Sequence, residues 1–186
     1  MSFRRFWHSL KQSVNPVGFG CWQLSGNYSI DGRPQGWGEI SEKEAIRLVE
    51  IALEKGIQFF DTAQAYGHGR SEIVLGKALR ASSRNKNAVI CTKIAFPSED
   101  NRSSDQIFGS KLEKSLRNLN REAIDVLLIH GPPDDLDWHD FDSRPLERAL
   151  RSGKIRSFGV SARSIIGAKK FLESDVGHCL EWSFSF

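Results

Sequence analysis

Four side chains of complementary chemistry, Asp61, Tyr66, Lys93 and His130, lie at or just beyond the ends of short apolar runs. A tyrosine has a pKa of about 10 and donates a proton poorly at neutral pH, but a nearby ammonium stabilises its phenolate. An aspartate keeps the lysine charged and oriented through a charge-assisted hydrogen bond. An imidazole can hydrogen-bond a carbonyl oxygen. Together these groups can protonate a carbonyl oxygen while hydride reaches its carbon. Because no side chain donates hydride, a nicotinamide cofactor is implied.

These side chains meet only if the elements before them are neighbouring parallel strands. From residue 17 onward, apolar strand-like runs alternate with amphipathic helical patterns, about six strands with five helices. The expected strands are 17–22, 57–61, 88–93, 124–130, 154–160 and 177–186. The expected helices are 41–56, 71–80, 103–119, 145–153 and 163–174. This alternation indicates an α/β protein whose parallel sheet is covered by helices.

Helix start signals support this division. Ser41 and Glu44 have the spacing of a capping box, as do Ser103 and Gln106. Pro145 stands where a helix would begin. We therefore expect helices to start at these three places.

Two layouts fit the alternation, an open doubly wound sheet and a (β/α)8 barrel. The glycines of "GFGCWQLSG" have the wrong spacing for a dinucleotide-binding G-x-G-x-x-G, which disfavours the doubly wound sheet. In a barrel, the carboxyl ends of the strands share one face, where the four side chains would converge. We expect one domain over residues 1–186, in which residues 1–16 form a strand pair or cap at one end.

Composition limits the function classes. Lys and Arg number 26 against 23 Asp and Glu, a net charge of +3, which is too small a bias for a nucleic-acid or anionic-membrane partner. No apolar run approaches the roughly 20 residues that cross a bilayer. The scattered Cys21, Cys91 and Cys179 suit free thiols in a reducing compartment, so we expect a cytoplasmic protein. The segment before Asp31 has no acidic residue, so an organelle presequence is the alternative to the strand pair.

The stretch "GIQFFDTAQAYGHGRSEIVLGKAL" resembles the aldo-keto reductase signature G-x-x-F-F-D-T-A-x-x-Y-G-x-G-x-S-E-x-x-L-G. "GFGCW", "CTK", "IDVLLIHGP" and "GKIRSFGVS" follow in family order, so the resemblance covers roughly residues 4 to 186. It implies a (β/α)8 TIM-barrel reductase that uses NADPH, without a metal, to reduce a small aldehyde or ketone to an alcohol.

The resemblance also implies roles for single residues. Tyr66 resembles the proton donor, Lys93 and Asp61 the pair that tunes it, and His130 the residue that orients the carbonyl. On the cofactor side, the resemblance implicates Asp61, Trp22 as a wall of the nicotinamide and substrate pocket, Ser161, and Glu181.

Two departures from the family pattern concern the cofactor carboxamide. After "GVS" the family has Asn, and this chain has Ala162. Where the last matching strand usually presents Gln, this chain has Glu181, which can accept from an amide N–H but donates only when protonated. We therefore expect the carboxamide to be held differently.

The third departure is length. A (β/α)8 domain typically needs about 250 residues, and the 186-residue chain ends after the sixth expected strand. We therefore expect strands seven and eight, which carry most contacts to the cofactor phosphates in the family, to be missing. We expect an incomplete barrel with open edges and self-association through them. The sequence leaves NADP and NAD, and the substrate, undistinguished.

Alternatives stay open. The chain can be a truncated, catalytically poor member, or a regulatory subunit that resembles the channel-associated β subunits. Asp61 can be a loop cap, Trp22 ordinary core and Ser161 a helix cap. The acidic run "DDLDWHDFD" (134–142) lacks the Gly and Glu of a calcium loop, and we interpret it as a solvated loop, not a metal site.

Overall fold

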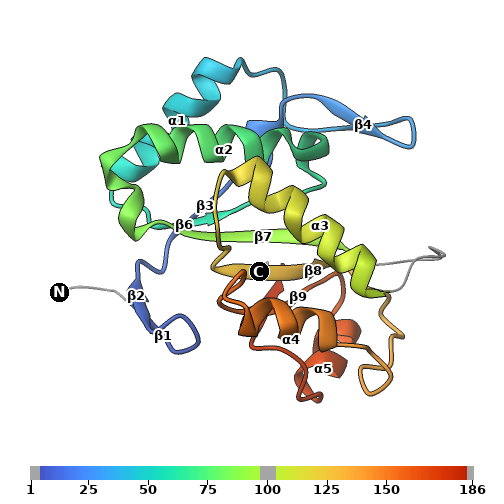
Figure 1. Cartoon of the computed structure of the whole chain (residues 1–186). Helices are drawn as coiled ribbons and strands as arrows, with labels where there is room; N and C mark the ends of the chain where they lie inside the picture. The colour runs from blue at the N-terminus through green and yellow to red at the C-terminus, as the bar shows by residue number, and fades with distance from the viewer. Residues whose placement is uncertain (1–4, 97–103, 184–186) are drawn as a thin grey trace.

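Six parallel strands form the central sheet of the computed structural model, which describes residues 5–96 and 104–183 (Figure 1). The strands lie side by side in the order in which they occur in the chain. They are β3 (Gly18–Gly20), β6 (Phe59–Asp61), β7 (Val89–Ala95), β8 (Val126–His130), β9 (Phe158–Ala162) and β10 (Cys179–Trp182).

A helix follows each of the first five strands of this sheet. The helices are α1 (Glu42–Glu54), α2 (Arg70–Ala81), α3 (Ser104–Leu119), α4 (Arg144–Arg151) and α5 (Ile165–Leu172). They lie along the outside of the curled sheet, one after another (Figure 1). The sheet is therefore a half-barrel, which confirms the expected incomplete (β/α)8 fold and excludes the open doubly wound sheet.

The helix starts follow the sequence signals. Ser41 caps α1 by accepting from the backbone N–H of Glu44, whose side chain accepts from the backbone N–H of Ser41. α4 has proline in its first turn, as Pro145 predicted. The predicted cap Ser103 lies outside the described residues.

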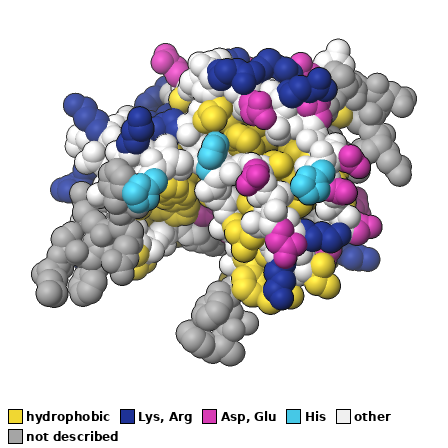
Figure 2. Space-filling view, turned by 90° about the horizontal axis from the view of Figure 1, so that it is seen from below, with side chains coloured by type: hydrophobic (Ala, Val, Ile, Leu, Met, Phe, Trp, Pro, Cys, Tyr) yellow, Lys and Arg dark blue, Asp and Glu magenta, His cyan; other side chains and the backbone are white. Residues whose placement is uncertain are grey.

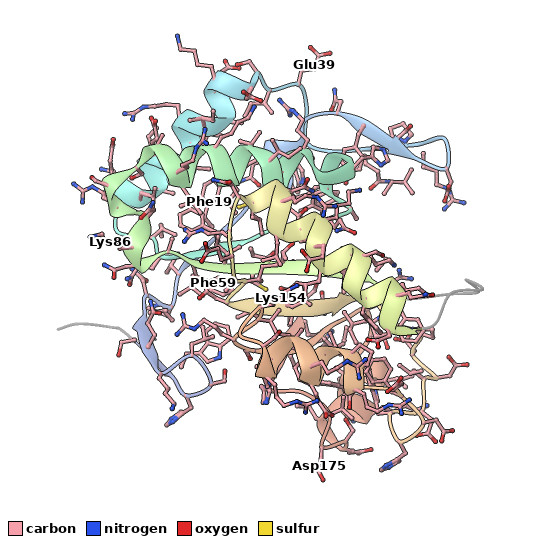
Figure 3. The ribbon with its side chains drawn as sticks, in the orientation of Figure 1. Phe19, Glu39, Phe59, Lys86, Lys154 and Asp175 are labelled. Carbon is pink, nitrogen blue, oxygen red and sulfur yellow. The ribbon has the colours of Figure 1, made fainter. Side chains whose placement is uncertain are left out.

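The alternating side chains of the strands divide the core into two clusters. Phe19 and Phe60 face the helices, with ring centroids 6.0 Å apart. Phe59 faces the concave side, where it packs against Trp7 of the amino-terminal segment. Phe19 and Phe59 are labelled in Figure 3. The concave cluster also contains Leu10, Val14, Val89, Cys91, Val126 and Leu128.

The amino-terminal segment forms an antiparallel pair, β1 (Arg5–Trp7) with β2 (Gln12–Val14). This hairpin contacts the chain just before β9. Arg156 donates to the carbonyl of Leu10 at 2.5 Å, and Ser9 donates to Ser157 at 3.2 Å. Because these contacts precede β9, the hairpin covers the amino end of the half-barrel and leaves the carboxyl end accessible.

A second hairpin was not predicted from the sequence. β4 (Tyr28–Ile30) pairs with β5 (Arg33–Gln35) through a two-residue turn at Asp31 and Gly32, whose φ angles are 48° and 74°. Positive φ at both positions favours the Asp-Gly dipeptide, so the sequence did carry this signal. The hairpin lies at one edge of the molecule in Figure 1.

The surface carries both signs of charge. Basic and acidic side chains both appear on the face seen in Figure 2, among separate hydrophobic areas. This mixture agrees with the small net charge of +3. Within the described part of the chain, none of the helices combines the length and the apolar character that a membrane span needs.

Candidate active site

The register of the parallel strands places the expected site residues on one face. Asp61 is opposite Cys91, and His130 is opposite Ser161, which is in turn opposite Glu181. Registered partners share a face and side chains alternate along each strand, so Lys93 lies on the same concave face as Cys91. The five residues Asp61, Lys93, His130, Ser161 and Glu181 therefore converge at the carboxyl end of the half-barrel.

Lys93 is the centre of this group, and its side chain is fully buried. Its ammonium donates to Asp61 Oδ1 at 2.5 Å and to the carbonyl oxygen of Thr62 at 3.2 Å. It also lies 3.4 Å from Glu181 Oε1. The ammonium is therefore within ion-pair distance of two carboxylates, which are delivered by strands on opposite sides of β7.

Burial and charge oppose each other in this cluster. Burial favours the neutral amine of Lys93, but the charges of Asp61, Cys91 and Glu181 act against it and the pKa of Lys93 is raised. Burial also raises the pKa of Asp61 to about 6, against the lowering effect of Lys93, and Glu181 raises it further. At neutral pH the lysine is charged, and it lies between the two carboxylates.

Tyr66 is brought over this cluster by a short turn after β6. The turn η2 (Tyr66–Gly69) has positive φ at Gly67 and His68, 58° and 54°, and it leads directly into α2. The Lys93 ammonium lies 5.4 Å from the centre of the Tyr66 ring. The ring stacks on Trp22 at 6.0 Å and meets His130 edge to face at 6.0 Å. Tyr66, Lys93, His130 and Trp22 thus lie together at the carboxyl end of the half-barrel.

Burial decides the protonation states of Tyr66 and His130. It raises the pKa of Tyr66 although Lys93 lowers it, so the net effect on the phenol is opposite to the lowering that the sequence suggested. Burial, assisted by the charge of Lys93, lowers the pKa of His130 to about 4. Near neutral pH the site therefore offers a protonated phenol beside an uncharged imidazole.

The remaining expected residues are also at this end of the sheet. Ser161 donates to Glu181 Oε1 at 3.0 Å. It does not cap the next helix, because Ser164 is the N-cap of α5 and accepts from Gly167. Trp22 is 36% exposed and donates from Nε1 to the Tyr28 hydroxyl at 3.0 Å, so it is not a core residue.

Metal ligands were considered at two places. Ligand atoms of Asp61, Cys91 and Glu181 lie within 4.8 Å of one another, but the Lys93 ammonium already contacts both carboxylates. Burial raises the pKa of the Cys91 thiol well above its usual value, which disfavours a thiolate ligand. The acidic loop 134–142 is anchored by buried Trp138, which packs against Phe171, so it is not a purely solvated loop.

Three residues near the site, Trp37, His68 and Arg163, were not assigned a role from the sequence. Trp37 meets Trp22 edge to face at 5.8 Å, and His68 meets Tyr28 in the same manner at 5.6 Å. Arg163 is close enough to lower the pKa of His130. The sequence shows only that these residues lie in loops that follow strands. Such a position does not reveal the direction of a side chain.

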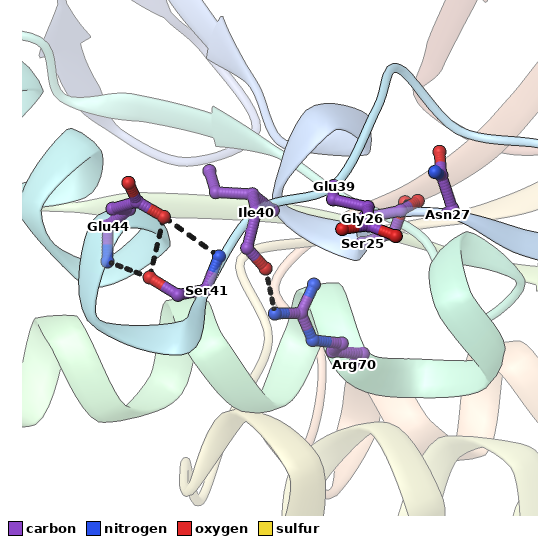
Figure 4. Close-up of a pocket in the computed structure, with 8 residues that line it drawn as sticks. All are labelled: Ser25, Gly26, Asn27, Glu39, Ile40, Ser41, Glu44 and Arg70. Carbon is purple, nitrogen blue, oxygen red and sulfur yellow. Dashed lines mark hydrogen bonds between the residues drawn. The ribbon is translucent and has the colours of Figure 1, made fainter.

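One pocket of about 570 Å³ lies apart from these residues, between the segment after β3 and the start of α1 (Figure 4). Arg70 donates to the carbonyls of Leu24 and Ile40, at 2.9 and 2.7 Å. Ser41 and Glu44 are occupied with each other in the α1 capping box. The polar groups of this pocket therefore hold the loop to α1 and α2. None of the four catalytic candidates lines the pocket.

The half-barrel and the group at its carboxyl end define a protein of the (β/α)8 class with a tyrosine, lysine, aspartate and histidine together at one face. The family model "Aldo/keto reductase family" matches residues 16–176. The chain therefore belongs to the aldo/keto reductase family.

Individual relatives agree with this assignment. The chain is 32% identical to the aldo-keto reductase YhdN of Bacillus subtilis, over 80% of this chain and 44% of that protein. It is 34% identical to a 6-dehydroglucose reductase of Novosphingobium aromaticivorans, over 86% of this chain and 51% of that protein. The holo form of aldo-keto reductase AKR11C1 from Bacillus halodurans superposes with a TM-score of 0.78 at 25% identity, over 99% of this chain and 58% of that chain. The chain thus spans about half the length of the curated relatives it matches.

Proposed function

We propose that the protein reduces an aldehyde or ketone to an alcohol with NADPH, and that Tyr66 donates the proton. The arrangement of the Tyr66 ring, 6.0 Å from the His130 ring and 5.4 Å from the Lys93 ammonium, is the observation that carries this proposal. A bound NADPH would supply hydride to the carbonyl carbon. Family membership supports oxidoreductase chemistry.

Each of the four residues has a distinct part in this proposal. His130 is neutral, so it donates a hydrogen bond to the carbonyl oxygen and orients it without carrying a charge. Tyr66 transfers its hydroxyl proton to that oxygen as negative charge develops there. Lys93 stabilises the phenolate that remains, and Asp61 positions Lys93. Asp61 thus acts on Tyr66 through the lysine.

The residues at the end of β9 and β10 fit the nicotinamide end of the cofactor. A carboxamide needs a hydrogen-bond donor and an acceptor, and the Ser161 hydroxyl and the Glu181 carboxylate provide one of each. They already form a 3.0 Å hydrogen bond with each other on the concave face. We propose that this pair, with Trp22 as a wall, holds the carboxamide.

The test is NADPH oxidation by the purified protein with a neutral aromatic aldehyde. Tyr66→Phe removes only the hydroxyl, so we expect the turnover rate to fall about 10²- to 10⁴-fold, the usual contribution of a general acid. NADPH binding, followed by tryptophan fluorescence, is expected to be unchanged because the ring that stacks on Trp22 is kept.

The chain has two tyrosines, so Tyr28→Phe is a matched control that removes the other phenol. It loses the hydrogen bond from Trp22, and we expect an effect on KM with little effect on the turnover rate. A Tyr66→Phe variant as fast as its parent would contradict the proposal, as would a parent that binds NADPH yet reduces no aldehyde.

A further inference from the structure

We propose that Arg163 forms a binding subsite for a carboxylate on the substrate, so that the protein acts on carbonyl compounds that also carry an acid group. This inference rests on the proposed reductase function and adds the class of substrate. It concerns a residue that belongs to neither the catalytic group nor the carboxamide pair.

The position of Arg163 follows from the strand ends. Arg163 comes directly after β9, and Gly131 comes directly after β8 and donates from its backbone N–H to the carbonyl of Ser161 at 2.9 Å. A Cβ placed on Gly131 would lie 2.3 Å from Arg163 Nε and 3.0 Å from its Cζ. The guanidinium therefore lies against the backbone of the residue that follows the catalytic imidazole.

The electrostatics agree with this placement. Besides burial and Lys93, the charge of Arg163 contributes to the lowered pKa of His130. The contact at Gly131 thus places a permanent positive charge beside the carbonyl-orienting residue, and the lowered pKa of His130 agrees with that position.

No described residue neutralises the charge of Arg163. Lys93 is in contact with Asp61 and Glu181, whereas Arg163 forms no ion pair with any residue in 5–96 or 104–183. Asp134 approaches the first turn of α5 at Gly167 instead. Arg163 is also exposed, so it is accessible to a ligand.

A guanidinium with free N–H groups suits a carboxylate, since two parallel N–H donors match its two oxygens. His130 and Gly131 are consecutive, so an acid group at Arg163 would be only a few bonds from a carbonyl at His130. A phosphate of the cofactor shares the same oxyanion chemistry. We assign the subsite to the substrate because Arg163 lies beside the carbonyl-orienting histidine, on the β8 side of β9, whereas the proposed carboxamide pair extends toward β10.

The experiment measures binding of two aldehydes of similar shape, para-carboxybenzaldehyde and para-tolualdehyde, to the parent chain, Arg163→Gln and Arg163→Lys. Ligand-observed NMR without NADPH supplies the dissociation constants. Arg163→Gln should weaken the carboxylate ligand about tenfold, the loss of one charge-assisted contact, and change the neutral ligand by less than about twofold. Arg163→Lys, which keeps the charge but loses the planar fork, should be intermediate.

Arg84→Gln is the matched control for net charge, because Arg84 is an exposed arginine before β7, away from the carboxyl end. If it weakens the carboxylate ligand as much as Arg163→Gln does, the effect is long-range and the subsite is wrong. Equal weakening of both aldehydes by Arg163→Gln, or no binding of the carboxylate by the parent, would also overturn it.

The two proposals fail in different ways. NADPH titration of Arg163→Gln tests the cofactor phosphate: weaker NADPH binding with an unchanged carboxylate affinity overturns the substrate subsite. Reduction of para-tolualdehyde by the parent tests the reductase function independently of Arg163. If Arg163→Gln weakens only the carboxylate ligand but the parent reduces no aldehyde, the subsite proposal stands and the proposed reductase function is contradicted.

Discussion

At the scale of single residues, the site depends on one buried ammonium that holds two carboxylates in place. The two contacts are unequal, because Lys93 is 2.5 Å from Asp61 and 3.4 Å from Glu181. Glu181 is also the more exposed of the two, at 38% against 24% of the side chain. The structure therefore predicts that the two carboxylates differ in their contribution to stability.

Asp61→Asn should destabilise the protein more than Glu181→Gln. Removing one partner of a buried ion pair costs about 3–5 kcal/mol, but we expect Asp61→Asn to cost less than this, because Glu181 still faces Lys93 and burial already disfavours the charged form of Asp61. Glu181→Gln should cost less, since the closer carboxylate remains. Urea unfolding at neutral pH measures both, and the reverse order would show that Glu181 is the main partner of the lysine.

His130 should make stability depend on pH. Its pKa is about 6.5 when unfolded and about 4 in the structure, so the unfolded chain binds more protons between these values. Stability from the neutral imidazole is present above about pH 6.5 and is lost as the pH falls toward about 4. A raised pKa acts in the opposite direction. The pKa of Asp61 is about 6 in the structure, so the contribution of its protonated form to the stability of the protein is lost as the pH rises through that value.

The variant His130→Asn removes the pH-dependent contribution of the imidazole and keeps that of Asp61. We expect the free energy of unfolding of the parent to fall by about 1–2 kcal/mol more than that of the variant between about pH 7 and about pH 5. Urea titrations at the two pH values give the difference. Parallel losses in both proteins would mean that the imidazole is not held neutral.

At the scale of elements, α2 and α3 pack closely enough to exclude a methyl group. A Cβ on Gly76 of α2 would lie 2.6 Å from the carbonyl oxygen of Leu119, at the end of α3, and 2.9 Å from that of Asn118. These atoms belong to the backbone, so they cannot turn away as a side chain would. The glycine therefore sets the distance between the two helices.

Gly76→Ala should lower stability by about 1–3 kcal/mol, as overpacking does in other cores. Gly109→Ala in α3 is the matched control, because nothing lies within 4 Å of its added Cβ. It should raise stability by up to about 1 kcal/mol through helix propensity. Thermal unfolding of both variants checks this, and a neutral Gly76→Ala would show that the helices can separate.

The elements also show how far the sequence could be interpreted. The sequence predicted the alternation of strands and helices, the helix starts at Ser41 and Pro145, and the convergence of the strand ends. It could do so because periodicity and helix-start signals are local. The β4–β5 hairpin was missed although Asp31 and Gly32 signal it. The contact between Arg163 and Gly131 could not be foreseen, since it depends on the direction of one side chain across two strands. Likewise, the pKa of Tyr66 depends on burial, which the sequence does not measure.

At the scale of the whole molecule, the described sheet has two unpaired edges, β3 and β10. Exposed edges can pair with other chains, and we propose that the protein self-associates through them. Trp182, at the end of β10, is 42% exposed and adds an apolar side chain to this edge.

Trp182→Lys should reduce this association, because a charge on an edge strand opposes pairing. Ile73→Lys is the control, since Ile73 is 39% exposed on α2, a helix that follows β6 and not an edge strand. Sedimentation velocity over a range of concentrations measures the oligomers. If both variants reduce them equally, general surface hydrophobicity and not the edge is responsible.

The order of the strands also bears on how the chain folds during synthesis. Each strand of the sheet lies beside the strand that precedes it in the chain, so every new strand can add to an existing edge as it leaves the ribosome, without insertion between two formed strands. The amino-terminal hairpin is the exception. Ser9 donates a hydrogen bond to Ser157, which is 148 residues later in the chain. Leu10 accepts one from Arg156, which is 146 residues later. The hairpin precedes every strand of the sheet in the chain, yet it can complete these contacts only after the segment just before β9 has been made.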